Sequence, residues 1–200
     1  MPSNPTSDAT PDPCARPVRA DARRNRSRVL EAARGAFATD GLAVPLDEIA
    51  RRAGVGPGTV YRHYPTKDAL FAAVVLDVFE SLRDHASALA ESPDPGQAFF
   101  TFFAHLIETG TTNQAIFDAL SGASPEVQTA SKTASNELGS ALADLLSRAQ
   151  TTKAVRADVT ADDLMPLIIG ALAAQTAIAP GGSPERLIQI TCDGLRPTNR

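Results

Sequence analysis

The chain has 200 residues and a formal net charge of −4, and it contains no run of about 18 apolar residues that could cross a membrane as a helix. Its first residues also lack the apolar core of a signal peptide, so we expect a cytoplasmic protein without a membrane partner. With only Cys14 and Cys192, the sequence shows no metal-ligand spacing and no disulfide framework, and we expect neither metal nor cofactor.

The charge is distributed unevenly along the chain. Residues 16–67 carry 11 Lys and Arg against 5 Asp and Glu, whereas residues 68–200 carry 8 against 16. A basic segment joined to an acidic body is typical of a protein that meets phosphate at one end only. The net negative charge therefore does not exclude a nucleic-acid-binding end.

The N-terminal stretch is predicted to be a disordered tail. Residues 1–20 hold five prolines and few large apolar side chains, so they cannot bury enough surface to order themselves. Arginines straddle the end of this tail at positions 16, 19, 23 and 24. We weigh two interpretations of them equally: a basic arm, with Arg24 among its DNA contacts, or incidental charges in solvent.

The next three predicted helices form a compact unit. The first covers about residues 21–39 and ends at Gly41. The second covers residues 46–53, with apolar residues at helical spacing, and Gly54 can end it in the left-handed conformation. Gly56 and Pro57 then suit the start of a third, short helix. Two helices joined by so tight a turn predict a helix-turn-helix over residues 46–64.

The third helix has one polar face suited to DNA. Val60 and Tyr64 are four residues apart and are expected to face inward, which leaves the opposite side to polar groups. Arg62 is the expected base reader, because its planar guanidinium matches the edge of guanine. The whole set of expected DNA contacts is Pro57, Gly58, Thr59, Tyr61, Arg62, His63, Lys67 and Arg24. A merely solvated face would explain any one of these residues, but it does not explain the set beside a glycine turn.

These residues form part of a longer ordered pattern. It consists of Ala36, Phe37, Gly41, Ile49, Ala50, Ala53, Gly54, Val55, Thr59, Tyr61, His63, Lys67, Leu70 and Phe71. The pattern resembles the TetR family of bacterial transcriptional regulators over about residues 29–79, a quarter of the chain. It departs from the family at Pro45, where many relatives have a Ser or Thr that caps the second helix and touches phosphate. Pro45 cannot make that side-chain contact.

The rest of the chain is predicted to be helical as well. A long helix begins at Thr66, and after a proline-rich break further helices are expected over 96–110, 113–121, 125–150, 161–179 and 184–195. Pro166 should kink the penultimate helix or delay its start. We therefore expect an all-α fold of about nine helices, divided into a tail (1–20), a helix-turn-helix domain (21–67) and a ligand-binding and dimerisation domain (68–200).

A small-molecule pocket and a dimer interface are implied mainly by the family resemblance. The candidate pocket residues are Phe79, Phe99, Phe102, Phe103, His105, Phe117, Leu120, Leu142, Leu146, Met165 and Gln175. The candidate interface residues are Leu164, Leu167, Ala171, Ile178, Leu187 and Ile190. From the sequence alone, both sets fit ordinary core packing equally well. A two-fold homodimer would present two recognition helices roughly 34 Å apart to a palindromic operator.

The leading hypothesis is thus a dimeric repressor that binds a double-stranded DNA operator and is released by an apolar or amphipathic small-molecule effector. A transcriptional activator and a ligand-independent regulator are the alternatives within this class. An enzyme is disfavoured, because the three histidines form no HExxH pattern and neither a serine elbow nor a phosphate-binding loop is present, so no catalytic residue is proposed. A helical interaction protein would bind in a salt-sensitive way without preferring any DNA sequence.

Overall fold

The computed structural model describes residues 15–177 and 183–197, and within these ranges the chain is helical, with no strand. None of the described helices is both long enough and apolar enough to span a bilayer. The α-helices are α1 (Ala15–Asp40), α2 (Leu46–Ala53), α3 (Pro57–His63), α4 (Lys67–Ala90), α5 (Pro95–Thr112), α6 (Gln114–Ala119), α7 (Pro125–Thr151), α8 (Ala161–Thr176) and α9 (Pro184–Gly194). The prediction of an all-α fold with about nine helices is confirmed.

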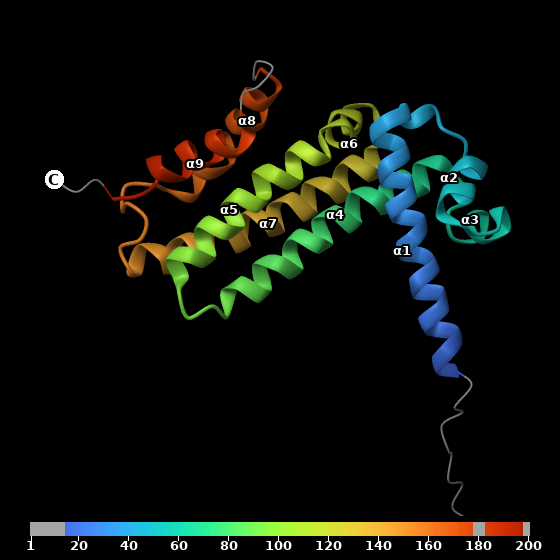
Figure 1. Ribbon diagram of the computed structural model, residues 1–200, viewed down its shortest axis with the longest axis horizontal. Helices are drawn as coiled ribbons and strands as arrows, with labels where there is room; N and C mark the ends of the chain where they lie inside the picture. The colour runs from blue at the N-terminus through green and yellow to red at the C-terminus, as the bar shows by residue number, and fades with distance from the viewer. Residues whose placement is uncertain (1–14, 178–182, 198–200) are drawn as a thin grey trace, which may run out of the picture.

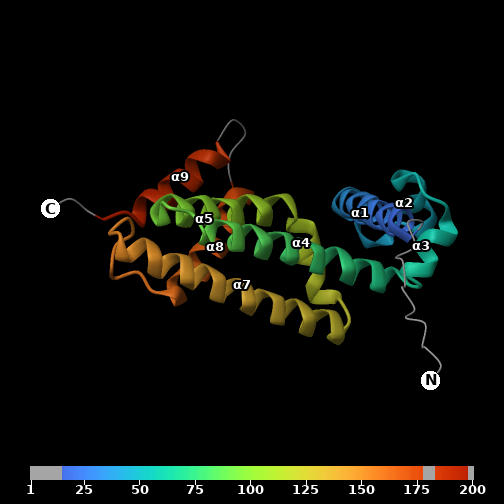
Figure 2. The same ribbon diagram turned by 90° about the horizontal axis from the view of Figure 1, so that it is seen from below.

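The helices form two groups that share α4. Helices α1 to α3 lie at one end of the molecule, while α4, α5 and α7 run alongside one another as a bundle, with α8 and α9 near its far end (Figures 1 and 2). We call α1 to α3 with the first turns of α4 the head, and the remaining helices the body. Each group has its own hydrophobic cluster.

Helix α4 contributes to both clusters. Leu70, Phe71, Val74 and Val75 are buried in the cluster of the head, whereas the next turns of the same helix, from Val78 onward, are buried in that of the body. The boundary that we expected between residues 67 and 68 falls after the first residue of α4, the helix that the two parts share. Because α4 is continuous, it joins the two hydrophobic clusters directly.

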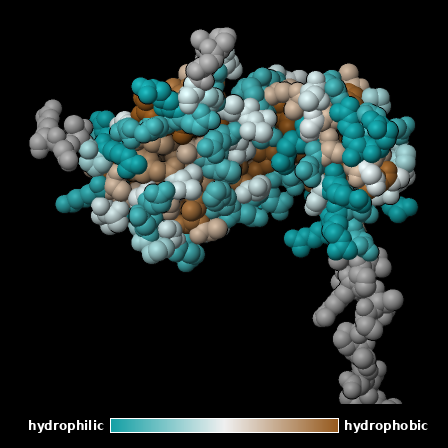
Figure 3. Space-filling model, viewed as in Figure 1, coloured by the Kyte–Doolittle hydropathy of each residue, from teal (hydrophilic) through white to brown (hydrophobic). Residues whose placement is uncertain are grey.

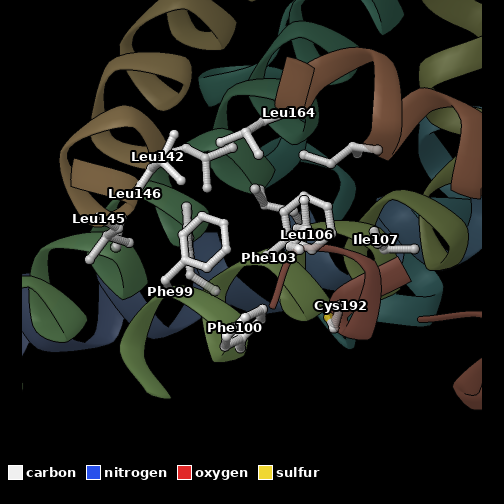
Figure 4. Close-up of a cluster of buried hydrophobic side chains, with 14 of the residues drawn as sticks. Phe99, Phe100, Phe103, Leu106, Ile107, Leu142, Leu145, Leu146, Leu164 and Cys192 are labelled. Carbon is white, nitrogen blue, oxygen red and sulfur yellow. The ribbon is translucent and has the colours of Figure 1, made fainter. Parts of the chain in front are cut away.

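The body core is built on the aromatic helix α5. Phe99, Phe102 and Phe103 are fully buried, and Figure 4 shows the rings of Phe99 and Phe103 among leucines of α7 and α8, including Leu142 and Leu164. A helix that is apolar over so wide an arc is packed by neighbours on several sides. Helices α4, α5 and α7 contact one another and share this hydrophobic core.

The first helix differs from its predicted extent. It begins at Ala15, so residues 15–20, which we assigned to the tail, belong to a helix instead. Alanine and arginine have high helix propensity, and Pro17 stands in the first turn, where its missing N–H costs little. The remainder of the predicted tail, residues 1–14, lies outside the described residues.

The penultimate helix starts at residue 161, as predicted. Thr160 and Asp163 form a capping box, and α8 continues from Ala161 through Pro166 to Thr176. Pro166 therefore does not delay the start of the helix. The predicted end of this helix at residue 179 lies outside the described residues.

Gly54 determines the tight turn between α2 and α3. Its φ is +64°, and its N–H donates to the carbonyl oxygens of Ala50 and Arg51, which closes the helix end. Gly58, by contrast, lies inside α3, and a Cβ atom there would meet no neighbour within 4 Å. The two glycines are therefore a matched pair, of which Gly54 alone needs the left-handed conformation.

We expect Gly54→Ala to lower the free energy of unfolding by about 1–2 kcal/mol, because an L-residue is strained in this conformation. Gly58→Ala should change it by less than about 1 kcal/mol. Urea denaturation of both variants checks this, and equal losses from the two would contradict the role given to Gly54.

Candidate nucleic-acid interface and cavity

The helix-turn-helix buries one side of α2 and α3. Leu46, Ile49, Ala50 and Ala53 of α2 are buried, as the apolar spacing predicted. Val60 of α3 is buried too, and so is Tyr64, which directly follows that helix. The expectation that Val60 and Tyr64 both face inward is therefore confirmed. The side of α3 that carries Val60 is the side packed into the core of the head.

The other side of α3 is open to solvent. Pro57, Gly58, Arg62 and His63 are exposed, Tyr61 is 46% exposed, and Thr59 is half-buried. Within the described ranges, the Arg62 guanidinium forms neither an ion pair nor a hydrogen bond with the protein. Five of the expected DNA contacts thus lie together on one accessible surface of a seven-residue helix.

Lys67 lies at the amino end of α4, beside this surface. Thr66 caps the helix, because its hydroxyl accepts a hydrogen bond from the N–H of Ala69 at 3.1 Å. The Lys67 ammonium donates to the carbonyl oxygen of Ala43, also at 3.1 Å. One of its three donors is therefore held by the protein, and two remain to meet an anion at the helix terminus.

Asp47, which the sequence reasoning missed, lies near the exposed face. The negative charge of Asp47, followed by partial desolvation, raises the pKa of the Tyr61 phenol. Nothing in the sequence signals this pairing, because the two residues stand on different helices.

Two arginines of α2 are neutralised by acidic neighbours. Arg51 and Arg52 both contact Glu48, at 2.7 and 2.8 Å, and Arg52 also reaches Asp40 at 2.7 Å. Hydrogen bonds from Arg51 and then Arg52 lower the pKa of Glu48 from 4.5 to about 2. These arginines form ion pairs within α2 and with the last residue of α1. Their positive charge is therefore partly balanced by neighbouring carboxylates.

Helix α1 carries exposed arginines toward the helix-turn-helix. Arg24 is exposed and paired with Asp21, while Arg28 donates to the Asn25 side chain at 2.5 Å. The guanidinium of Arg28 also approaches the turn, since it would lie 3.8 Å from a Cβ atom on Gly54. Arg28 was not among the expected contacts, although its place one turn beyond Arg24 on the same helix is a signal that could have found it.

The body contains a cavity of about 580 Å³ between α4, α5, α6, α7 and α8. Three of the expected pocket residues, Phe79, Phe117 and Met165, lie on its wall. The remaining wall residues are Leu82, Leu106, Gly110, Gln114, Asp118, Ser135, Leu138, Ile168, Ile169, Leu172, Ala173 and Thr176. Figure 3 shows hydrophobic residues gathered in hollows of the body between hydrophilic ridges.

The expected pocket has to be corrected at the other positions. Five of these residues are packed in the body core and are absent from the wall: Phe99, Phe102, Phe103, Leu142 and Leu146. Leu120 packs against the cluster of the head. His105 lines a separate cavity of about 340 Å³ with Arg34 and Asn113, and Gln175 lines neither cavity. Helical spacing identifies the apolar faces of the helices. It does not tell which faces pack tightly in the core and which enclose a cavity.

The expected interface residues divide by exposure. Leu167 and Ile190 are 39% and 57% exposed, and Leu187 is partly buried. Leu164 and Ala171 are buried within their own chain, so we remove both from the interface. Ile178 lies outside the described residues. Ile169, on the same helix α8, is 60% exposed, lies on the cavity wall and was not among the expected interface residues.

Comparison with known proteins places both halves of the chain. Residues 29–74 match the family model of bacterial regulatory proteins of the tetR family, and residues 94–197 match the C-terminal domain of SbtR-like transcriptional regulators. The structure of a TetR transcription regulatory protein from Mycobacterium vanbaalenii is 41% identical, with a TM-score of 0.74, and the match covers 90% of this chain and 99% of that one. The TetR transcriptional regulator SCO0520 from Streptomyces coelicolor is 31% identical, with a TM-score of 0.71 and coverages of 87% and 99%.

Curated relatives match over shorter stretches. The HTH-type transcriptional regulator UidR from Escherichia coli K12 is 29% identical over 93 residues, 46% of this chain and 44% of UidR. The HTH-type transcriptional regulator SrpR from Pseudomonas putida is 37% identical over 83 residues, 41% of this chain and 37% of SrpR. The matches thus span less than half the length of either relative.

A tight helix-turn-helix with an exposed polar second helix, joined to a larger helical body, is the architecture of a helix-turn-helix regulator. The chain belongs to the TetR family of bacterial regulatory proteins. The predicted resemblance is confirmed. Because this is a family of transcriptional regulators and not of enzymes, the prediction that the chain is not an enzyme is confirmed as well.

The lowered pKa of Glu48 makes part of the stability of α2 depend on pH. This contribution is fully present above pH 4.5, the ordinary pKa, and is lost as the pH falls toward about 2. We expect the midpoint of thermal unfolding to fall less steeply over this range in Glu48→Gln than in the wild type.

In the double variant Arg51→Gln and Arg52→Gln, carboxyl NMR titration should show the pKa of Glu48 returning toward 4.5, and an unchanged pKa would contradict the assigned cause.

Proposed function

We propose that the protein is a transcriptional repressor that binds a palindromic operator as a homodimer and leaves it when a small apolar or amphipathic molecule occupies the body cavity. The observation that carries the proposal is the exposed polar face of α3, held on a helix-turn-helix whose core includes the first turns of α4. The other half of α4 contributes Phe79 and Leu82 to the cavity wall.

The short helix α3 is suited to enter the major groove of DNA by its amino end. Its exposed Pro57 and Gly58 bring the backbone close to a phosphate, and the free N–H groups of a helix terminus favour an anion there. Arg62 is assigned to a base edge, because its guanidinium is exposed and unpaired in the described part of the chain. Tyr61, His63 and Lys67 are assigned to phosphates, which set the register without reading sequence.

The dimer is proposed to form through the outer faces of α8 and α9. Leu167, Ile169 and Ile190 are large apolar side chains exposed on these two helices. Burial of such side chains against a second copy would remove apolar surface from water. A two-fold axis through this surface would pair the two heads, so that their α3 helices meet half-sites roughly 34 Å apart.

Ligand release is proposed to act through α4 and α6. On α6, Phe117 lies on the cavity wall while its neighbour Ile116 is buried in the cluster of the head. Arg34 of α1 and Asp77 of α4 form an ion pair at 2.7 Å, which fixes α1 to the turn of α4 between the two clusters. A ligand that fits better when these helices shift would favour the arrangement that does not match the operator, and a coupling of about 1–3 kcal/mol would weaken operator binding roughly 5- to 150-fold.

Selection of bound duplexes from a random pool tests the proposed function. We expect enrichment of palindromes whose half-sites are about one helical turn apart, followed by release when an effector is added. Equal affinity for random and selected duplexes would overturn sequence-specific binding and favour a helical interaction protein. Reporter expression that rises with the protein would indicate an activator, and release by no compound would indicate a ligand-independent regulator.

The division between base reading and phosphate contact gives a further prediction. Arg62→Ala should cost about 1–3 kcal/mol at one base position and relax specificity there, whereas Lys67→Ala should weaken all duplexes to a similar degree. Arg83→Ala is the matched control, because Arg83 pairs with Glu137 on the body, away from α3. Fluorescence anisotropy with duplexes that carry single base changes measures all three, and uniform losses from both head variants would refute the assignment.

A further inference from the structure

The wall of the body cavity carries one acidic residue and no basic residue. Most of its side chains are apolar, and its polar groups come from Gln114, Asp118, Ser135 and Thr176. Asp118 is the one charged residue among the lining residues, which include no Lys, Arg or His. The wall as a whole is therefore apolar with a single negative charge.

The carboxylate of Asp118 lies at the rim, where it has a neutral partner. The side-chain amide of Gln114, one turn earlier on α6, donates to one carboxylate oxygen at 2.7 Å. No ion pair in the described part of the chain involves Asp118, and its side chain is exposed. Its charge is thus available to a bound molecule instead of being balanced by the protein.

Two aromatic rings line the same cavity as this carboxylate. Phe117 precedes Asp118 on α6 and meets Phe79 of α4 edge to face, with ring centroids 6.0 Å apart, and both rings line the cavity. The face of an aromatic ring attracts a cation, and desolvation inside a cavity strengthens that attraction. Carboxylate and rings therefore favour the same sign of charge on a ligand.

We propose that the cavity binds a lipophilic organic cation, with its apolar body among the leucine and isoleucine side chains and its charged group beside Asp118 and Phe117. A volume of about 580 Å³ is within the range of sites for organic molecules of drug size. An amphiphile with a carboxylate head is disfavoured, because the wall offers it a like charge and no basic partner. The inference rests on the proposed function for its regulatory meaning, but the binding preference is a property of the cavity alone.

A series of ligands with one tail and three head groups tests the charge preference. Decyltrimethylammonium, 1-decanol and decanoate would be titrated into the full-length protein by calorimetry, below their micellar concentrations. We expect the cation to bind most tightly and decanoate most weakly, with the cation about fivefold tighter than the alcohol because the charge pair lies at an exposed rim. Decanoate binding as tightly as the cation would overturn the proposal.

Substitution of the carboxylate identifies its source. Asp118→Asn keeps the size of the side chain and an oxygen for Gln114, so we expect it to lose about fivefold in affinity for decyltrimethylammonium and to leave 1-decanol unchanged. Asp84→Asn is the matched control, since Asp84 is an exposed carboxylate of α4 outside the cavity. Unchanged cation binding by Asp118→Asn, with its helical content preserved by circular dichroism, would refute the role of Asp118.

Duplex release separates this inference from the proposed function. If the cation binds preferentially but releases no selected duplex, the cavity chemistry stands and the ligand-released repressor fails. If decanoate releases the duplex and the cation does not, the repressor stands and the inferred ligand class fails. Both readouts use the same full-length protein.

Discussion

The continuity of α4 is the physical constraint on which the rest of the structure depends. Its first turns are buried with α1, α2 and α3, and its later turns are buried with α5 and α7. The same helix is thus packed into two cores, and packed cores change between discrete arrangements instead of deforming continuously. The position of the exposed face of α3 is therefore tied to the packing around the body cavity, and the Arg34–Asp77 ion pair adds to this coupling.

Charge is used differently in the two parts of the protein. In the head, several arginines are held by carboxylates, as in the Glu48 and Asp40 contacts of α2, so the free positive charge is concentrated at a few exposed positions such as Arg62. Under the proposed function, this arrangement would limit sequence-independent attraction to DNA and leave Arg62 accessible as the proposed base reader. In the body, the cavity has the opposite sign, because Asp118 stands there without a basic partner among the lining residues. A cation in the cavity and an anion at α3 would therefore not compete for the same site.

The helix α6 has a role larger than its six residues suggest. It packs against α1, it buries Ile116 in the cluster of the head, and it presents Phe117 and Asp118 to the cavity. Such a short helix has little stability of its own and takes its position from its neighbours. A molecule that contacts α6 from the cavity side therefore acts on an element whose opposite side already touches the head.

The sequence by itself determined the helices and the turn that carries the recognition face. Helical spacing of apolar residues, the capping box of Thr160 and Asp163, and the glycine at position 54 are local signals, and local hydrogen bonding is enough to express them. Only the tertiary structure decided which apolar faces fill the core and which enclose a cavity, as the burial of Phe102 and the exposure of Phe117 to the cavity illustrate. It also decided the pairing of Tyr61 with Asp47 and of Arg34 with Asp77. These contacts join residues on different helices, so they depend on how whole helices pack and not on any spacing along the chain.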